Sequence, residues 1–520
     1  MYKVIIFFVG VILLISCNTA SKTSQVTATD YRPLYHFTAD SNWINDPNGL
    51  LYHDGEYHLF YQYNPFGNNW GHMSWGHSVS KDLISWKALP VALYEDKNTK
   101  DNDTSMIFSG SAVIDSNNTS GFGTKENPPM VAIYTAFVHG GRNGNGEYKP
   151  KAQNQAIAYS IDKGLTWTKY DGNPVLDIKS LEFRDPKVFW YGPQQKWVMI
   201  VSKPDQYESW FYESKNLKEW AYMSKWGKAG DTTHFWECPD LIELKVNNSA
   251  EKKWVMLSSS GTPQQGFYGG MQYFVGDFDG KQFTPLRDYT KPVYLDFGKD
   301  YYAAVCFNNA PNDRKVMVGW MSNWEYGRDI PTGNTWRGVF AVPRALSLIK
   351  VGNDYNLVQT PVTELSTFMK ESLSLNEQNV ASDFDLSWKG TSYQLELTIE
   401  PGKAKAAGVK ILKTNNEETT IRFDAATNQL SFDRTRSGDT SFSKKFATIE
   451  TAPVALKDGK LKLKILVDKC IAEVFVNDGE ITMSQLVFPL GSEGGIQLFS
   501  EGGQSVFTSV KVWDIPGTKK

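Results

Sequence analysis

Three acidic residues lie in short segments rich in aromatic and turn-forming residues rather than on a charged face. Asp46 lies in Trp-Ile-Asn-Asp-Pro-Asn-Gly (43–49), Asp185 in Glu-Phe-Arg-Asp-Pro (182–186) and Glu237 in Phe-Trp-Glu-Cys-Pro-Asp (235–240). The apolar neighbours of Glu237 favour a protonated carboxyl group, which suits this residue to donate a proton. The three segments therefore predict acid–base chemistry by carboxyl groups.

Each segment also has a purely structural interpretation. Asp-Pro-Asn-Gly is a good β-turn, with Pro at the second position and Gly at the fourth. An Arg-Asp pair before Pro is often an exposed strand end, because Pro keeps the preceding residue extended. Glu237 alone fits the rim of a strand equally well. Glycosidic bond cleavage, however, needs both a proton donor and a second carboxylate, so the combination favours a catalytic site.

The elements that must position these acids are predicted to be strands. No amphipathic helical pattern appears from Tyr31 to Leu346, and short apolar or alternating runs end at Gly, Asn, Asp or Pro. This pattern is typical of an all-β fold. Strands are expected, for example, at 55–63, 129–137, 196–202, 253–259 and 315–321.

A weak internal repeat indicates how the strands are grouped. Ser-Lys-Asp-Leu-Ile-Ser-Trp at 80–86 is echoed at 160–167, 214–220 and, more loosely, 276–283, each copy being a polar turn that leads to an aromatic residue. A unit of about 60 residues with four short strands is typical of a propeller blade. Residues 31–345 are therefore predicted to form a five-bladed β-propeller, whose separate blades can point acids into one central funnel. The alternative is a β-sandwich with similar hairpin turns.

A second domain is predicted after the propeller. Of 17 Trp residues, only Trp388 and Trp513 follow residue 345, so the composition changes there. We expect a linker over 346–372, with some helical propensity after Pro361, and a β-sandwich over 373–520, where apolar and polar residues alternate. A packing or oligomer role is the default for this domain.

Composition restricts the partners. The formal charge of the 520 residues is -3, from 54 basic and 57 acidic side chains, so an electrostatic nucleic-acid binder is not expected. The aromatic content of 14% fits either large β-rich cores or a surface that stacks sugar rings. A neutral partner is the prediction.

The N-terminus predicts export and lipid attachment. Residues 1–16 form a basic and then apolar signal segment, too short to span a bilayer, and Leu-Ile-Ser-Cys ends at Cys17 like a bacterial lipobox. Residues 17–30 are then a tether, and we expect a lipid-anchored protein on the periplasmic face or surface of a bacterial envelope. An ordinary signal peptide with an incidental Cys is the alternative. Three widely spaced Cys residues remain, which argues against disulfides and zinc.

Five short motifs follow one another along the chain: residues 43–49, Phe-Ser-Gly-Ser at 108–111, Arg-Asp-Pro at 184–186, Glu-Cys-Pro at 237–239 and Gly-Trp-Met-Ser-Asn-Trp at 319–324. Together, in this order, they closely resemble glycoside hydrolase family 32. The resemblance runs from about residue 35 to 512. The family contains invertases, inulinases and levanases, which cleave β-fructofuranosides. The resemblance implies a five-bladed propeller followed by a β-sandwich. This agrees with the two domains predicted above.

The resemblance also implies roles for single residues. Asp46 matches the nucleophile, Glu237 the general acid and base, and Asp185 the transition-state stabiliser, so the reaction retains the anomeric configuration. Implied fructose-binding residues are Trp43, Asn45, Gln62, Trp70, Phe108, Ser109, Arg184, Trp320 and Trp324. Trp236 is also expected to face a fructosyl ring. No metal or other cofactor is implied, and the spacing of His72 and His77 is no ligand pattern; hydrogen bonding or space filling is expected instead.

Within the family, residues 269–280 and the Trp before Glu237 look like bacterial levanases and exo-inulinases. We therefore expect release of fructose from the ends of levan or inulin and from sucrose. An endo-levanase, a fructosyltransferase, a hydrolase of arabinosides or xylosides and a non-catalytic fructan-binding lipoprotein are the alternatives. The choice between β2,1 and β2,6 linkages depends on loop shape and stays open.

Overall fold

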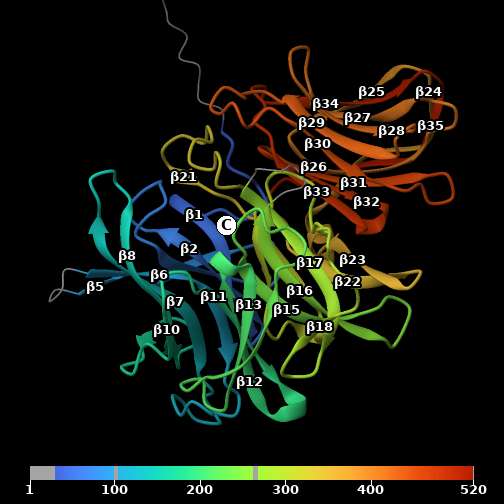
Figure 1. Cartoon of the computed structure of the whole chain (residues 1–520). Helices are drawn as coiled ribbons and strands as arrows, with labels where there is room; N and C mark the ends of the chain where they lie inside the picture. The colour runs from blue at the N-terminus through green and yellow to red at the C-terminus, as the bar shows by residue number, and fades with distance from the viewer. Residues whose placement is uncertain (1–29, 99–102, 262–267, 519–520) are drawn as a thin grey trace, which may run out of the picture.

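The computed structural model describes residues 30–98, 103–261 and 268–518, in which nearly all regular structure is β-strand (Figure 1). The predicted signal segment, the tether before residue 30 and Cys17 lie outside these residues. Within the described ranges, no helix combines the length and the apolar character needed to cross a membrane. The all-β prediction is confirmed.

Five sheets follow one another along the first part of the chain. The first holds β1 (Asn42–His53), β2 (Glu56–Asn64), β3 (Ser74–Ser80), β4 (Lys87–Leu93) and the short β21 (Trp336–Arg337). The second holds β5 (Asp96–Asn98), β6 (Asp103–Ile114), β7 (Met130–Arg142), β8 (Tyr148–Ser160), β9 (Thr168–Lys169) and β10 (Leu176–Ser180). The third holds β11 (Arg184–Tyr191), β12 (Lys196–Lys203), β13 (Glu208–Ser214) and β14 (Ala221–Gly227).

The fourth sheet holds β15 (Glu237–Lys245), β16 (Lys252–Gly261), β17 (Tyr268–Phe278) and β18 (Phe283–Pro285). The fifth holds β19 (Tyr302–Cys306), β20 (Val316–Trp320), β22 (Arg344–Val351) and β23 (Asp354–Pro361). Short 3-10 turns η1 (Gly192–Gln194), η2 (Pro204–Gln206) and η3 (Pro311–Asp313) connect strands of these sheets.

The innermost strands of the five sheets form a closed ring. β1 contacts β6, β6 contacts β11, β11 contacts β15, β15 contacts β19, and β19 contacts β1 again. Figure 1 shows the sheets fanning outward from this ring. The arrangement agrees with the predicted five-bladed propeller.

The internal repeat found in the sequence is a repeated turn. Its four copies lie between β3 and β4, β8 and β9, β13 and β14, and β17 and β18. In three of them the indole NH of the closing Trp donates to the carbonyl three residues earlier, at Trp86, Trp167 and Trp220. The same local hydrogen bonds therefore close equivalent turns in successive blades.

The predicted boundary at residue 345 is too early. β22 and β23 complete the fifth sheet, so residues 346–361 are strands of the propeller rather than a linker. Leu346, Leu348 and Leu357 alternate into a buried core, which fixes these strands in the sheet. Only the 3-10 turn η4 (Thr363–Phe368) separates β23 from the second domain.

The second domain is a sandwich of two six-stranded sheets that share one apolar core, which confirms the predicted architecture. One sheet holds β24 (Lys370–Val380), β26 (Ser392–Glu400), β31 (Leu461–Asp468), β32 (Ile471–Val476), β33 (Ile481–Leu486) and β35 (Ser505–Asp514). The other holds β25 (Asp383–Gly390), β27 (Ala406–Lys413), β28 (Glu418–Asp424), β29 (Gln429–Arg436), β30 (Ile449–Pro453) and β34 (Gly494–Glu501). The turn η5 (Asn477–Gly479) joins β32 to β33.

Buried ion pairs join the two domains. Arg344, at the start of β22, is fully buried; it donates to Asp296 at 3.0 Å and to Ser484 at 2.5 Å, and it pairs with Glu473 on β32. A second arginine, Arg434 on β29, reaches back to the propeller in the same way. Because a buried charge is costly without its partner, these contacts fix how the sandwich sits on the propeller.

The start of the described chain is held by the same network. The ring of His36 lies between Asp468 at 3.0 Å and Glu473 at 2.9 Å. Burial alone lowers the pKa of His36, but the hydrogen bonds and charges of the two carboxylates outweigh it and raise this pKa to about 9. The segment that leads into β1 is therefore anchored on the sandwich by a charged imidazolium.

Candidate active site

A β-bulge interrupts each of the five innermost strands near the axis of the ring. The register shifts lie between residues 44 and 47, 107 and 110, 184 and 187, 237 and 240, and 302 and 305. A bulge leaves a residue unpaired and changes the direction of its side chain. Pro186 and Pro239 lie within two of these bulges, and Pro47 borders a third; a Pro has no N–H to give to the ladder. Asp-Pro-Asn-Gly is therefore part of strand β1, and its interpretation as a β-turn is wrong.

Asp46 has a fixed carboxylate. Asn45 donates its amide to Oδ1 at 3.0 Å, and the Ser109 hydroxyl from the neighbouring blade donates to Oδ2 at 2.7 Å. The indole NH of Trp43 holds the Asn45 side chain at 2.8 Å. Burial raises the pKa of Asp46, whereas these hydrogen bonds lower it. The oxygens thus have one defined orientation toward the axis.

Asp185 lies beside Asp46 and belongs to the third blade. Its backbone adopts a left-handed φ of 63°, and its Oδ2 accepts the backbone N–H of Cys238 at 3.0 Å. The Cys238 sulfur lies 3.6 Å from Oδ2 of both Asp46 and Asp185, so the two carboxylates share one neighbour. The Asp185 N–H donates to Thr135 at 3.0 Å. Asp185, on the third blade, is therefore held by contacts from the second and the fourth blade.

The pKa of Asp185 is raised to about 7, and burial is the largest cause. The positive charge of Arg184 acts in the opposite direction, and the negative charges of Glu237 and Asp46 act in the same direction as burial. Three acids converging in one buried region cause this shift. A strongly shifted pKa of a carboxyl group is common at catalytic sites.

Glu237 has polar partners. Arg184 donates to its Oε1 from Nε at 2.9 Å and from Nη2 at 2.8 Å, and the Tyr302 hydroxyl donates to Oε2. The expectation of apolar company for this side chain is therefore wrong. The neighbouring Trp236 is fully buried among other aromatic rings and donates to the Asp231 carbonyl at 2.6 Å, so it does not face the site. Because successive side chains alternate in direction along the chain, Glu237 and Trp236 point to different sides.

The aromatic residues predicted to bind fructose fall into two groups. Trp43 and Trp320 are 0% exposed, with ring centroids 5.9 Å apart, so their faces are covered by protein. Trp324, 4.9 Å from Trp320, is half-buried, as is Trp70, whose ring lies 6.0 Å from Phe108. The last three can present a ring face to a sugar.

Of the predicted polar residues, Gln62 is buried and donates to the Ile107 carbonyl at 3.0 Å, which ties the first blade to the second. Sequence reasoning missed Thr135, Gln153 and Tyr302, which support Asp185, Arg184 and Glu237 respectively. Tyr302 begins the innermost strand of the fifth sheet, and only its place in the ring could have indicated it.

His72 and His77, which lie before and within strand β3 of the first sheet, both make hydrogen bonds. His72 contacts Glu95 at 2.7 Å, and His77 contacts His58 at 3.1 Å in the interior of the blade. Burial lowers the pKa of His77 well below its usual value. No group of three or more His, Cys, Asp or Glu residues within the described chain is arranged to hold a metal ion.

The site thus offers two buried carboxylates and a third carboxyl group held by a guanidinium and a phenol. One carboxylate can attack an electrophilic carbon, while a separate carboxyl group exchanges a proton with a leaving oxygen. The half-buried rings of Trp70, Phe108 and Trp324 belong to the same apolar cluster as Cys238 and Tyr302, which contact these acids. This is an arrangement for cleaving an acetal between sugar rings.

The raised pKa of Asp185 predicts a pH-dependent gain of stability on its removal. Well below pH 3.8 the carboxyl group is protonated in both states; as the pH rises from about 3.8 to about 7, the unfolded chain releases the proton while the folded chain retains more of it, and stability is lost. Asp185→Asn should therefore unfold at a higher temperature than the wild type at pH 8, and the difference should shrink toward pH 4. Thermal unfolding at several pH values measures this.

Asp171→Asn, which changes an exposed acid, is the matched control and should show no such trend. A constant difference between Asp185→Asn and the wild type across this pH range would contradict the assignment of the shift to Asp185.

Sequence profiles match both domains. The profile “Glycosyl hydrolases family 32 N-terminal domain” matches residues 36–361, and “Glycosyl hydrolases family 32 C terminal” matches residues 362–514. The junction between the two matches coincides with the end of β23. Together the two matches span both structural domains.

Individual proteins agree with the profiles. The levanase of Bacillus subtilis (strain 168) is 43% identical over 512 residues, covering 96% of this chain and 72% of the relative. The extracellular exo-inulinase of Aspergillus awamori is 38% identical over 518 residues, covering 94% and 95%. The crystal structure of exo-inulinase from Aspergillus awamori superposes with a TM-score of 0.87 at 38% identity, covering 94% of this chain and 98% of that one.

Proposed function

Because the chain belongs to glycoside hydrolase family 32, we propose that it releases fructose from the ends of fructan chains and from sucrose with retention of configuration. It is a glycoside hydrolase of the β-fructosidase type that acts on fructans. The observation that carries the proposal is the convergence of Asp46, Asp185 and Glu237 at the bulges of three innermost strands.

Asp46 acts as the nucleophile. Its carboxylate, oriented by Asn45 and Ser109, attacks the anomeric carbon of the terminal fructosyl unit. The bond from that carbon to the leaving oxygen breaks, and Glu237 gives its proton to this oxygen. Water then replaces Asp46 and gives a proton back to Glu237, so the two inversions restore the original configuration.

Asp185 stabilises the transition state by accepting hydrogen bonds from fructose hydroxyls, where its buried position strengthens each bond. Arg184 acts by orienting Glu237 through two hydrogen bonds. Trp70, Phe108 and Trp324 offer ring faces, and Trp43 and Trp320 pack against Trp324. A fructan or fructo-oligosaccharide is the substrate.

A product profile tests the exo-acting proposal. Purified protein incubated with inulin, levan and sucrose should release free fructose from the earliest time points, because the proposed exo action removes one terminal unit at a time. Separation of the products by chromatography measures this. Early oligosaccharides from levan without free fructose would instead identify an endo-levanase, and comparison of initial rates on the two polymers ranks β2,1 against β2,6 linkages.

The proposed location is the bacterial envelope, with a lipid on Cys17 as anchor. The support is the lipobox-like sequence at 14–17 and the polar tether that follows. Cys17→Ser should move the protein from the membrane fraction to the soluble fraction of the expressing cells. Retention of Cys17→Ser in the membrane fraction would contradict the lipid anchor. Protease treatment of intact cells distinguishes the surface from the periplasmic face.

A further inference from the structure

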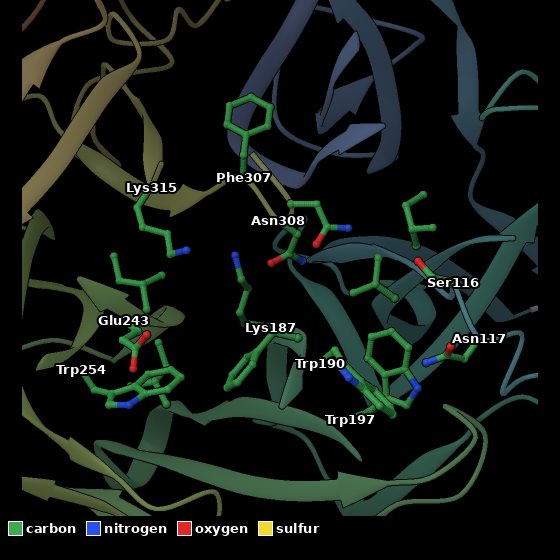
Figure 2. A pocket seen from close by; sticks show the side chains of 16 residues that line it. Ser116, Asn117, Lys187, Trp190, Trp197, Glu243, Trp254, Phe307, Asn308 and Lys315 are labelled. Carbon is green, nitrogen blue, oxygen red and sulfur yellow. The ribbon is translucent and has the colours of Figure 1, made fainter. Parts of the chain in front are cut away.

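A second cavity lies along the propeller axis at the opposite end from the acids. It has a volume of about 410 Å³ and includes Phe189 on β11 and Ile242 on β15, four or five residues beyond Asp185 and Glu237 on the same strands. Exposed Ser116, in the turn after β6, lies at its edge (Figure 2). The cavity is therefore reached from the opposite face of the propeller.

A buried polar layer separates the two sites. Lys187 donates to Asp240 at 3.2 Å and to the Cys306 carbonyl at 2.7 Å, and the Cys306 N–H donates to the same carboxylate at 2.7 Å. These groups span three neighbouring blades, and the side chains of Lys187 and Asp240 are 6% and 0% exposed. A molecule in the second cavity is thus kept apart from Asp46 and Glu237.

Aromatic rings form two sides of the cavity. Figure 2 shows Trp254 on one side and Trp190 and Trp197 on the other. Trp190 packs against Trp197 at 5.0 Å, and Trp254 packs against Phe278 at 5.3 Å, so each ring is held in place from behind. Trp190 and Trp254 are half-buried, whereas Trp197 is 4% exposed and supports Trp190. Half-buried indole faces such as those of Trp190 and Trp254 suit the flat C–H faces of a sugar ring.

The polar groups of the cavity are balanced in charge. Glu243 pairs with Lys252 at 2.8 Å, Lys315 pairs with Asp313 at 2.9 Å, and Lys187 is neutralised by Asp240. The tips of Lys187, Lys315 and Glu243 surround the hollow in Figure 2. Donors and acceptors without a net charge favour a neutral, polyhydroxylated ligand over an anion.

We propose that this cavity is a second saccharide site, which binds one or two rings of a fructo-oligosaccharide without cleaving it. The volume lies within the range of small-molecule sites, roughly 300–1,000 Å³. The choice of a fructo-oligosaccharide rests on the proposed function, whereas binding of a neutral sugar rests on the cavity alone. Binding at such a site keeps the enzyme on its polymer while the catalytic acids cleave at a chain end.

Crystals of the full chain carrying Asp46→Asn, soaked with 1-kestose, test the proposal. Saccharide density is expected between Trp254 and Trp190 as well as in the funnel. Calorimetric titration of the same protein should show two binding events. Adding Ser116→Trp, which places a large side chain at the cavity edge from an exposed turn, should weaken one event at least tenfold.

Glu126→Trp, at an exposed position of the same connection outside the cavity, is the control and should leave both events unchanged. In the wild-type background, Ser116→Trp should leave the rate on sucrose unchanged. Absence of saccharide density in this cavity, or binding there of inorganic phosphate in preference to 1-kestose, would overturn the proposal. Turnover by Asp46→Asn would instead count against the proposed nucleophile, because density in the second cavity is observed independently.

Discussion

Asp46→Asn is expected to lower kcat for sucrose and fructan hydrolysis by on the order of 10⁴-fold or more, because the covalent intermediate can no longer form. This corresponds to about 5.5 kcal/mol of transition-state stabilisation. The amide has the shape of the carboxylate and removes a buried group whose ionisation is unfavourable, so the fold should persist. Initial rates and thermal unfolding of the same preparation measure both effects.

Azide provides a sharper test with Asp46→Ala, which opens space for a small anion. Azide should restore cleavage and give a fructosyl azide of inverted configuration, because it attacks in place of the missing carboxylate. Asp54→Asn, an exposed acid on the same sheet, is the control and should change kcat by less than about twofold. Activity of Asp46→Asn near the wild-type level would eliminate Asp46 as the nucleophile.

Arg344→Met is expected to lower the free energy of unfolding by about 3–5 kcal/mol. The substitution keeps an unbranched apolar stem but leaves Asp296 buried without its cation and leaves Glu473 with His36 as its remaining cation. Since these carboxylates belong to the propeller and to the sandwich, the contact between the domains should weaken most. Urea unfolding followed by tryptophan fluorescence, which mainly reports the propeller, and by circular dichroism should then give two separate transitions.

Arg436→Met removes an exposed arginine that pairs with Glu418 within the sandwich, and it should cost less than about 1 kcal/mol. Equal destabilisation by the two substitutions would show that burial of Arg344 carries no special weight. A single unchanged transition for Arg344→Met would show that the domains are held together by their apolar contacts.

The sequence predicted the elements that obey local rules. The alternation of residues marks most strands, and the Asp or Asn and Trp positions of the repeat mark equivalent turns, because their hydrogen bonds are formed within a few residues. The motif around Asp46 was also found from the sequence. Its placement in a strand was not, since Asp-Pro-Asn-Gly has the local preferences of a turn and only pairing with β2 and β21 overrides them.

Features that depend on distant residues were not predictable in the same way. The partners of Glu237 come from other blades, so its local apolar neighbours Phe235 and Trp236 gave a wrong picture of its surroundings. Trp43 and Trp320 are covered because they pack on each other across the closure of the ring. The sequence predicts a linker from residue 346 onward, but residues 346–361 are strands, because their core is completed by residues of other sheets.

The pairing of β1 with β21 has a consequence for synthesis in the cell. Asn42 and Trp43 pair with Trp336 and Arg337, almost three hundred residues later, and His36 is held by Asp468 and Glu473. A chain emerging from the ribosome therefore contains Asp46 early but cannot give it its final surroundings until the propeller is nearly complete. During translation the acid centre is one of the last parts to become competent, so an unfinished chain carries no working enzyme.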